Sequence, residues 1–292
     1  MEELGPGGVD VRPVRTIPNL EQEVSDALAP PVAAAEEHVR TQPVANLDET
    51  GWYEGREDGR AGRAWLWVAV TSLVTVFRIA RSRGEDVAKE LLGAGFRGFL
   101  GSDRWSGYAW VKAARRQLCW SHLIRDFQGF VDRADAGSKH GAALLELSVK
   151  MFQWWSRVRD GTLSRGTFRR SMAPVRREVE ALLRRAAACP APKTAGMAKQ
   201  ILKLEAALFT FVDHEGIEPT NNGAERAVRH GVMYRKTSFG TQGSAGSRFV
   251  ERMLTVVATL RQQQRNVLDF IAAAYSAKLT HAQPPTLLPS QR

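Results

Sequence analysis

All of the convincing strand signals in this 292-residue chain lie between residues 44 and 120. Apolar, aromatic and β-branched residues in that stretch predict strands at 44–48, 64–71, 75–80, 96–100 and 116–120. After Ser121 the apolar spacing predicts only helices: 121–133, 140–159, 165–188, 194–213, 222–231, 246–264 and 266–278. The helix at 194–213 has the clearest apolar face. This distribution indicates an α/β fold, with a sheet in the first half of the chain and helices in the second.

The order of the elements predicts how the sheet is connected. The second and third strands are joined by only three residues, 72–74, which indicates a hairpin. Helices expected at 84–94 and 107–113 precede the fourth and fifth strands, and crossover helices of this kind connect parallel strands. We therefore predict a mixed sheet. A lead-in with six prolines precedes it, and its helix near 19–35 should break or kink at Pro31.

Positive charge is concentrated in two tracts. The chain carries 41 Lys and Arg against 31 Asp and Glu, a net charge of +10. Residues 157–199 hold 11 basic and 3 acidic side chains, and residues 221–265 hold 8 and 2. Such tracts suit a polyanion such as nucleic acid, because neutralised phosphates release counterions. A solvated, arginine-rich helix face explains the charge equally well.

Several classes of protein are excluded by simple features. Two cysteines are too few for a disulfide scaffold or a four-cysteine zinc site. The longest apolar run, 64–70, is too short to span a bilayer, and the N-terminus lacks a signal-peptide pattern. We expect a soluble protein of a reducing, intracellular compartment.

Two aspartates follow predicted strands. Asp48 ends the first strand and Asp103 follows the fourth. Either one alone is explained as a turn or helix-capping residue. If the fourth strand lies parallel beside a central first strand, however, both carboxylates emerge at neighbouring positions. Neighbouring carboxylates repel unless a divalent cation neutralises them, and hard oxygen ligands favour Mg²⁺ or Mn²⁺.

The segment 219–229 opens a helix and contains a third acid. With Asn222 as N-cap, Glu225 would occupy the third helical position, as in a capping box. Asn222, Glu225 and Arg229 also share one helix face. That arrangement would equally suit a third metal ligand beside phosphate-binding groups.

The segment 119–125 joins the fifth strand to the first helix of the second half. Cys119 and His122 could form half of a zinc site, but the other cysteine, Cys189, lies in an Ala/Pro-rich link and offers no obvious partner. We favour a buried cysteine at the strand end, with His122 and Arg125 facing a phosphate.

Five segments in this order resemble the transposases of the insertion sequence 66 family. They are Leu47-Asp-Glu-Thr-Gly-Trp52, Ser102-Asp-Arg-Trp-Ser-Gly-Tyr108, Cys119-Trp-Ser-His-Leu-Ile-Arg125, Pro219-Thr-Asn-Asn-Gly-Ala-Glu-Arg226 and Arg235-Lys-Thr-Ser-Phe-Gly240. Each motif is weak alone, but five in order are specific, and their spacing fits across about residues 20–278. The resemblance implies an RNase H-like catalytic domain with an Asp-Asp-Glu triad, a large helical insertion and a helical C-terminal part.

Carried onto this sequence, the resemblance implies that Asp48, Asp103 and Glu225 are the catalytic, metal-binding triad. Two Mg²⁺ (or Mn²⁺) ions would support in-line phosphoryl transfer: a strand is cut at the end of the element, and the freed 3′-hydroxyl attacks target DNA. A homodimer would hold the two ends together. Contacts to DNA or support of the site are expected from His122, Arg125, Asn222, Arg226 and Arg229. The basic insertion would hold the DNA backbone through Arg169, Arg170, Arg176 and Arg177.

The resemblance also implies a division of the chain. We expect a partly helical lead-in (1–43), the first part of the catalytic domain (44–133), a basic helical insertion (134–215), the rest of the catalytic domain (216–280) and a disordered tail (281–292). The zinc-binding and DNA-binding regions that usually precede such a domain are expected to be missing. We expect a cytoplasmic, nucleoid-associated bacterial protein. Two alternatives remain open: a truncated, non-catalytic DNA-binding relic, and an RNase H-like nuclease without strand transfer.

Overall fold

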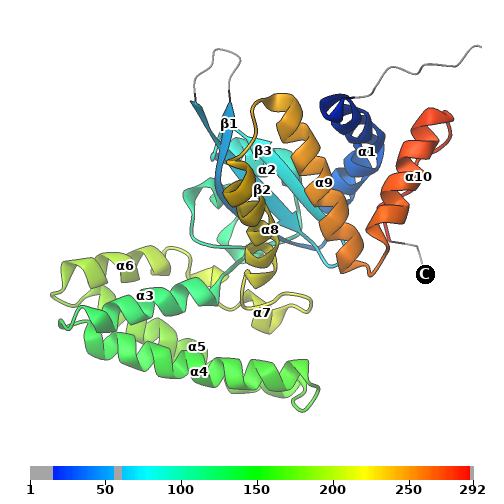
Figure 1. The fold of residues 1–292 in the computed structure, drawn as a ribbon. Coiled ribbons are helices and arrows are strands. Elements are labelled where there is room, and N and C mark those ends of the chain that lie inside the picture. Colours follow the sequence, from blue (N-terminus) through cyan, green and yellow to red (C-terminus); the bar gives the residue numbers. More distant parts are fainter. Residues whose placement is uncertain (1–15, 56–60, 290–292) are drawn as a thin grey trace, which may run out of the picture.

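A computed structural model describes residues 16–55 and 61–289 of the chain. Its sheet has the strand order β3-β2-β1-β4-β5 (Figure 1). The strands are β1 (Val44–Gly55), β2 (Ala61–Val70), β3 (Thr75–Ala80), β4 (Phe99–Ser102) and β5 (Arg116–Leu118). The first three strands pair antiparallel, whereas β4 pairs parallel with both β1 and β5. The mixed α/β sheet and the β2–β3 hairpin predicted from the sequence are confirmed.

Strand β1 is much longer than predicted. The sequence indicated a strand over 44–48, but β1 continues to Gly55 and pairs with β2 as far as Gly55↔Ala61. Gly51 and charged residues interrupt the local strand signal after Asp48. Pairing with β2 supplies the hydrogen bonds that hold these residues in the sheet, and this partner cannot be read from local sequence.

Helices cover both faces of the sheet and one of its edges. The first face packs against α1 (Ile17–Arg40) and α2 (Glu85–Leu92), and the second against α8 (Asn222–Ser238). The edge strand β3 is covered by α9 (Ser244–Gln262), and α10 (Val267–Leu279) packs beside α1 (Figure 1). Three side chains of α9 accept hydrogen bonds from backbone N–H groups of β3: Glu251, Thr255 and Thr259. The exposed donors of an edge strand are thereby satisfied.

Helix α1 is not broken at Pro31. The helix runs from Ile17 to Arg40 and contains both Pro30 and Pro31. Its buried face includes Leu28 and Val32, which flank the two prolines and pack into the core with the sheet. Burial of this apolar face offsets the helical hydrogen bonds that proline cannot donate.

The helical insertion has its own apolar core. Its helices are α4 (Ser138–Arg159), α5 (Arg165–Ala187) and α6 (Pro192–Leu202). They share this core with α3 (Trp120–Asp132), which precedes the insertion, and all four helices lie to one side of the sheet (Figure 1). The single helix predicted over 194–213 is wrong. The chain forms α6, a 3₁₀ turn at Glu205–Ala207 and the short helix α7 (Thr210–Asp213). The side chain of Gln117 bonds to the Leu208 carbonyl and the Phe211 N–H, which diverts the backbone from a continuous helix.

Two further segments differ from the structure that local sequence predicted for them. The short helix predicted at 107–113 is replaced by 3₁₀ turns at Ser106–Tyr108 and Ala113–Arg115. The C-terminal segment, expected to be disordered, includes Leu287, whose side chain is fully buried in the core that contains α9 and α10. Within residues 16–55 and 61–289, no helix is long and apolar enough to cross a membrane.

Candidate active site

Asp48 and Asp103 occupy equivalent positions on adjacent parallel strands. Strands β1 and β4 pair from Val44↔Phe99 to Asn46↔Gly101, a constant offset of 55 residues. The same offset separates Asp48 from Asp103, so both follow the last paired position by two residues. The strand arrangement on which the sequence argument depended is therefore confirmed. It places Asp48, within β1, and Asp103, after β4, just beyond the point where the two strands stop pairing.

The loop that carries Asp103 is held by hydrogen bonds. Its Oδ1 accepts the Trp105 backbone N–H at 2.8 Å, and its own carbonyl oxygen accepts Nη2 of Arg116 at 2.9 Å. Arg116 is a fully buried arginine beneath this loop.

Glu225 reaches the same region from α8. The N-cap of α8 is Asn221, not Asn222, and neither asparagine caps the helix through its side chain. The capping-box interpretation is therefore wrong. Instead, Nδ2 of Asn221 donates to the Leu47 carbonyl at 2.7 Å, which ties the start of α8 to β1 beside Asp48. Asn222 accepts a hydrogen bond from the Ser121 hydroxyl.

The Asp48 carboxyl responds to its burial and to the acids around it. Burial and, to a smaller extent, the nearby carboxylates of Glu49, Glu225 and Asp103 together raise the pKa of Asp48 from 3.8 to about 7. The backbone N–H of Glu49 donates to Asp48 at 3.0 Å and opposes this rise in pKa. The Asp48 carboxyl is therefore partly protonated at neutral pH when no cation is bound beside it.

Glu225 also lies against the start of α3. Its Oε1 is 3.4 Å from Nδ1 of His122 and 3.5 Å from Sγ of Cys119. In the described part of the chain, the potential ligand atoms of these three residues lie within 4.8 Å of one another, and Asp48 and Asp103 are outside this set. Sequence alone could not pair Cys119 with Glu225, because the two residues are 106 positions apart.

Glu49 is a site residue that the sequence argument missed. Its side chain is 3% exposed and forms an ion pair with Arg83 at 2.8 Å. It also accepts a hydrogen bond from the Tyr108 hydroxyl, and burial raises its pKa. Because Tyr108 follows Asp103 in the same motif, Glu49 joins β1 to the loop after β4. The sequence feature that could have identified Glu49 is its position next to Asp48.

Most of the chain matches a known protein family. The model of the transposase IS66 family matches residues 4–248. The chain belongs to the IS66 transposase family. It is also similar to an uncharacterized protein, y4qI, of Sinorhizobium fredii (strain NBRC 101917 / NGR234), with 26% identity over 244 residues. The match covers 73% of this chain and 43% of y4qI, so the IS66-family chain spans less than half the length of that relative.

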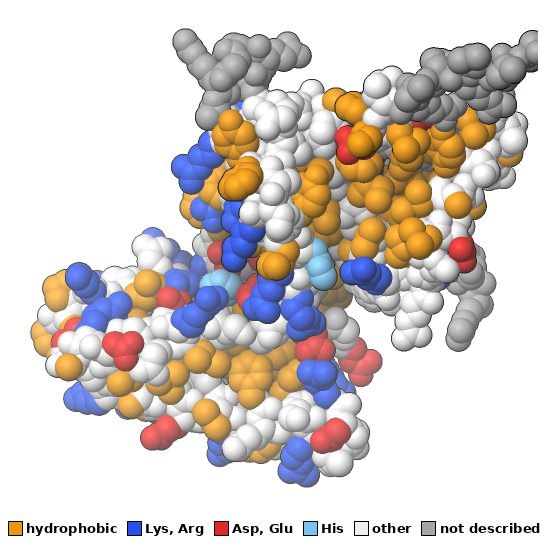
Figure 2. Space-filling model, in the orientation of Figure 1, with side chains coloured by type: hydrophobic (Ala, Val, Ile, Leu, Met, Phe, Trp, Pro, Cys, Tyr) orange, Lys and Arg blue, Asp and Glu red, His pale blue; other side chains and the backbone are white. Residues whose placement is uncertain are grey.

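The basic residues of this IS66-family chain fall into two groups. Arg125, Arg226 and Arg229 are exposed on α3 and α8. Figure 2 shows Lys and Arg side chains gathered along α8 and where α8 meets the helical insertion. A pocket of about 580 Å³ is lined by Asp103, Arg104 and His122, among others, whereas Arg226 lines a different pocket, over β2, β3 and α9.

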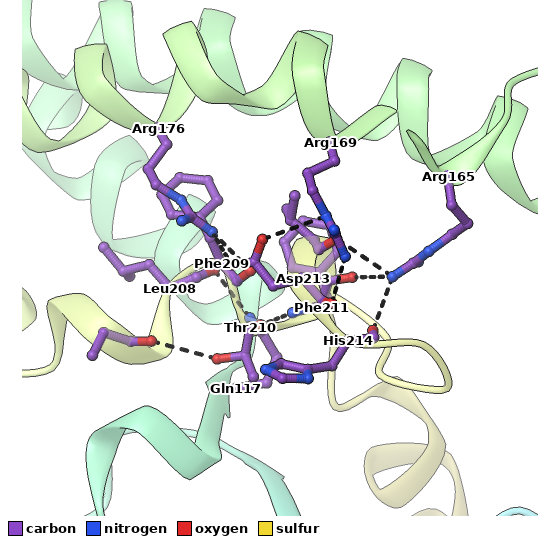
Figure 3. Close-up of polar contacts among 12 residues, drawn as sticks. Gln117, Arg165, Arg169, Arg176, Leu208, Phe209, Thr210, Phe211, Asp213 and His214 are labelled. Atoms are coloured by element: carbon purple, nitrogen blue, oxygen red, sulfur yellow. Dashed lines mark hydrogen bonds and ion pairs between the residues drawn. The ribbon is translucent and has the colours of Figure 1, made fainter. Parts of the chain in front are cut away.

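Most of the insertion arginines already have partners within the chain. Arg176 forms an ion pair with Asp213 at 2.7 Å, and Arg169 donates to the Asp213 carbonyl at 2.8 Å (Figure 3). Arg170 donates to Thr167 on its own helix, whereas Arg177 is exposed. Arg169 and Arg176 therefore hold α7 against α5 through Asp213.

The raised pKa of Asp48 predicts a pH-dependent stability. A carboxyl whose pKa is higher in the folded chain binds more protons when folded, so metal-free protein should lose stability as pH rises from about 4 to about 7. Asp48→Asn should reduce this loss, measured as the free energy of unfolding in urea with EDTA. Asp160→Asn is the control, because hydrogen bonds from Thr162 lower the pKa of exposed Asp160. If the free energy of unfolding of Asp48→Asn fell with pH as steeply as that of the wild-type chain, the raised pKa of Asp48 would be contradicted.

Proposed function

We propose that this chain is the catalytic part of a DNA transposase that cuts one DNA strand at the end of an insertion sequence and transfers the freed 3′ end to target DNA. The observation that carries the proposal is the placement of Asp48 and Asp103 at equivalent positions of adjacent parallel strands, with Glu225 near enough to raise the pKa of Asp48. Membership of a transposase family supports a role in DNA processing.

The strand order supports an RNase H-like catalytic domain. Three antiparallel strands are followed by two parallel ones, and the two aspartates emerge from the first and fourth strands. In this proposal, residues 44–133 and 216–280 together form the catalytic domain, and residues 134–215 are its insertion. Helix α8 belongs to the catalytic part because it packs on β1 and β2.

The three acids fit a divalent cation. Carboxylate oxygens are the hard ligands that Mg²⁺ and Mn²⁺ prefer, and a cation would offset the burial and the carboxylate repulsion that raise the pKa of Asp48. Asp48, Asp103 and Glu225 would hold it. A cation bound there supplies activation of the attacking oxygen and stabilisation of the leaving oxygen.

The remaining residues would position these acids and the DNA. Asn221 holds α8 to β1, and Glu49 holds the loop after β4 through Tyr108. Arg125, Arg226 and Arg229 would contact DNA phosphates without reading the base sequence. Two copies of the chain would be needed to hold both ends of the element.

A cleavage and joining assay tests the proposal. The purified chain is incubated with a plasmid that carries the DNA flanking its own gene, with Mg²⁺, with Mn²⁺ or with EDTA. We expect metal-dependent nicks at the inverted repeats and joined products in which a freed 3′ end is linked to new DNA. Nicks without joined ends would favour a nuclease, and DNA binding without nicks would favour a non-catalytic relic. Either result would overturn the proposed strand transfer.

A further inference from the structure

We propose that Cys119, His122 and Glu225 form a zinc site that competes with the catalytic use of Glu225. These residues come from the end of the fifth strand, the start of α3 and the first turn of α8. Binding of Zn²⁺ is independent of the proposed function. Its consequence, inhibition of DNA cleavage, rests on that function because it depends on Glu225 serving with Asp48 and Asp103.

The distances in the cluster suit a tetrahedral ion. Bonds from zinc of about 2.0 Å to nitrogen or oxygen and about 2.3 Å to sulfur place tetrahedral ligand atoms roughly 3.3–3.5 Å apart. Oε1 of Glu225 lies 3.4 Å from Nδ1 of His122 and 3.5 Å from Sγ of Cys119. Three protein ligands would leave the fourth position to water.

The unused hydrogen-bonding capacity of the cluster also indicates a cation. Nδ1 of His122 is a buried atom with no hydrogen-bond partner, yet it faces a carboxylate oxygen of Glu225. Two acceptor atoms at this distance repel unless a proton or a cation lies between them. The Asn221 backbone N–H donates to Sγ of Cys119 at 3.2 Å and holds the sulfur toward the cluster.

The ligand types select zinc over magnesium. A thiolate and an imidazole are ligands that Zn²⁺ binds well and Mg²⁺ avoids, whereas the three acids of the catalytic site are hard oxygen ligands. His122 is about one-third exposed and lines the pocket beside Asp103, so an ion can enter from solvent. Glu225 belongs to both sets, and when it binds zinc it is withdrawn from Asp48 and Asp103.

Cobalt substitution tests the site without any need for activity. Co²⁺ added to the metal-free chain should give the absorption of a tetrahedral, thiolate-bound ion, and Zn²⁺ should abolish it. Cys119→Ser should remove the sulfur-to-cobalt absorption and His122→Asn should weaken binding at least ~10-fold, because loss of even a supporting residue around a metal costs that much. Cys189→Ser is the matched control, since Cys189 lies outside the cluster, between α5 and α6.

The outcomes separate the two claims. A thiolate absorption that survives in Cys119→Ser, or disappears in Cys189→Ser, would overturn the zinc site. His122→Asn keeps this test valid if the cysteine variant does not fold, as judged by circular dichroism. If the wild-type chain cleaves DNA, micromolar Zn²⁺ should inhibit it and Cys119→Ser should be less sensitive. Equal inhibition of both would overturn the competition but leave the cobalt result standing.

Discussion

Replacing Asp103 with asparagine is expected to lower metal-dependent DNA cleavage at least ~10³-fold, which corresponds to about 4 kcal/mol of lost transition-state stabilisation. The reason is the loss of one negative ligand from a site whose acids come from β1, the loop after β4 and α8. Asparagine keeps Oδ1, so the hydrogen bond from the Trp105 N–H that shapes the loop is preserved. Folding and DNA binding should therefore be retained.

This prediction is checked by comparing initial cleavage rates in Mg²⁺ with thermal unfolding and DNA binding of the same preparations. Asp132→Asn is the matched control, because it removes the same charge from an exposed position near the end of α3. It should cleave at the wild-type rate. Full activity of the Asp103 variant would refute the triad, whereas loss of activity together with loss of folding would call for Asp48→Asn as the second test.

Replacing Trp120 with alanine is expected to cost about 4 kcal/mol of unfolding free energy, as large-to-small substitutions of buried aromatic residues do. Trp120 is fully buried where the insertion meets the sheet. Its ring lies 5.3 Å from that of Phe209 and 6.4 Å from that of Phe127, measured between centroids. Its Nε1 donates to the Leu208 carbonyl at 2.7 Å. Alanine would leave a cavity and remove this hydrogen bond.

Urea unfolding followed by circular dichroism measures the effect. Trp120→Phe should lose only about 1 kcal/mol of unfolding free energy, because phenylalanine keeps an aromatic ring in the core and loses mainly the hydrogen bond. Trp154→Ala is a second comparison, since Trp154 is only partly buried on α4. If Trp120→Ala lost no more unfolding free energy than Trp154→Ala, the contacts of Trp120 between the insertion and the sheet would not stabilise the fold as inferred.

The sheet illustrates what local sequence can and cannot predict. Alternating β-branched and aromatic residues located β2 and β3, and the crossover helix placed β4 parallel to β1. The full length of β1 was missed because its second half depends on pairing with β2. The break of the 194–213 helix was missed because it depends on Gln117, a residue from another element.

The sequence by itself determined the α/β fold class, the mixed sheet and the β2–β3 hairpin, because hydrophobic periodicity and short connections are local properties of the chain. The proximity of Asp48 to Asp103 followed only from the parallel pairing of β4 with β1 in the structure. The tertiary structure alone decided where Glu225 points, that Cys119 and His122 meet it, and that Arg169 and Arg176 are engaged by Asp213. Side-chain partners depend on contacts between residues far apart in sequence. Such contacts are fixed only when burial of the separate apolar faces brings the elements together.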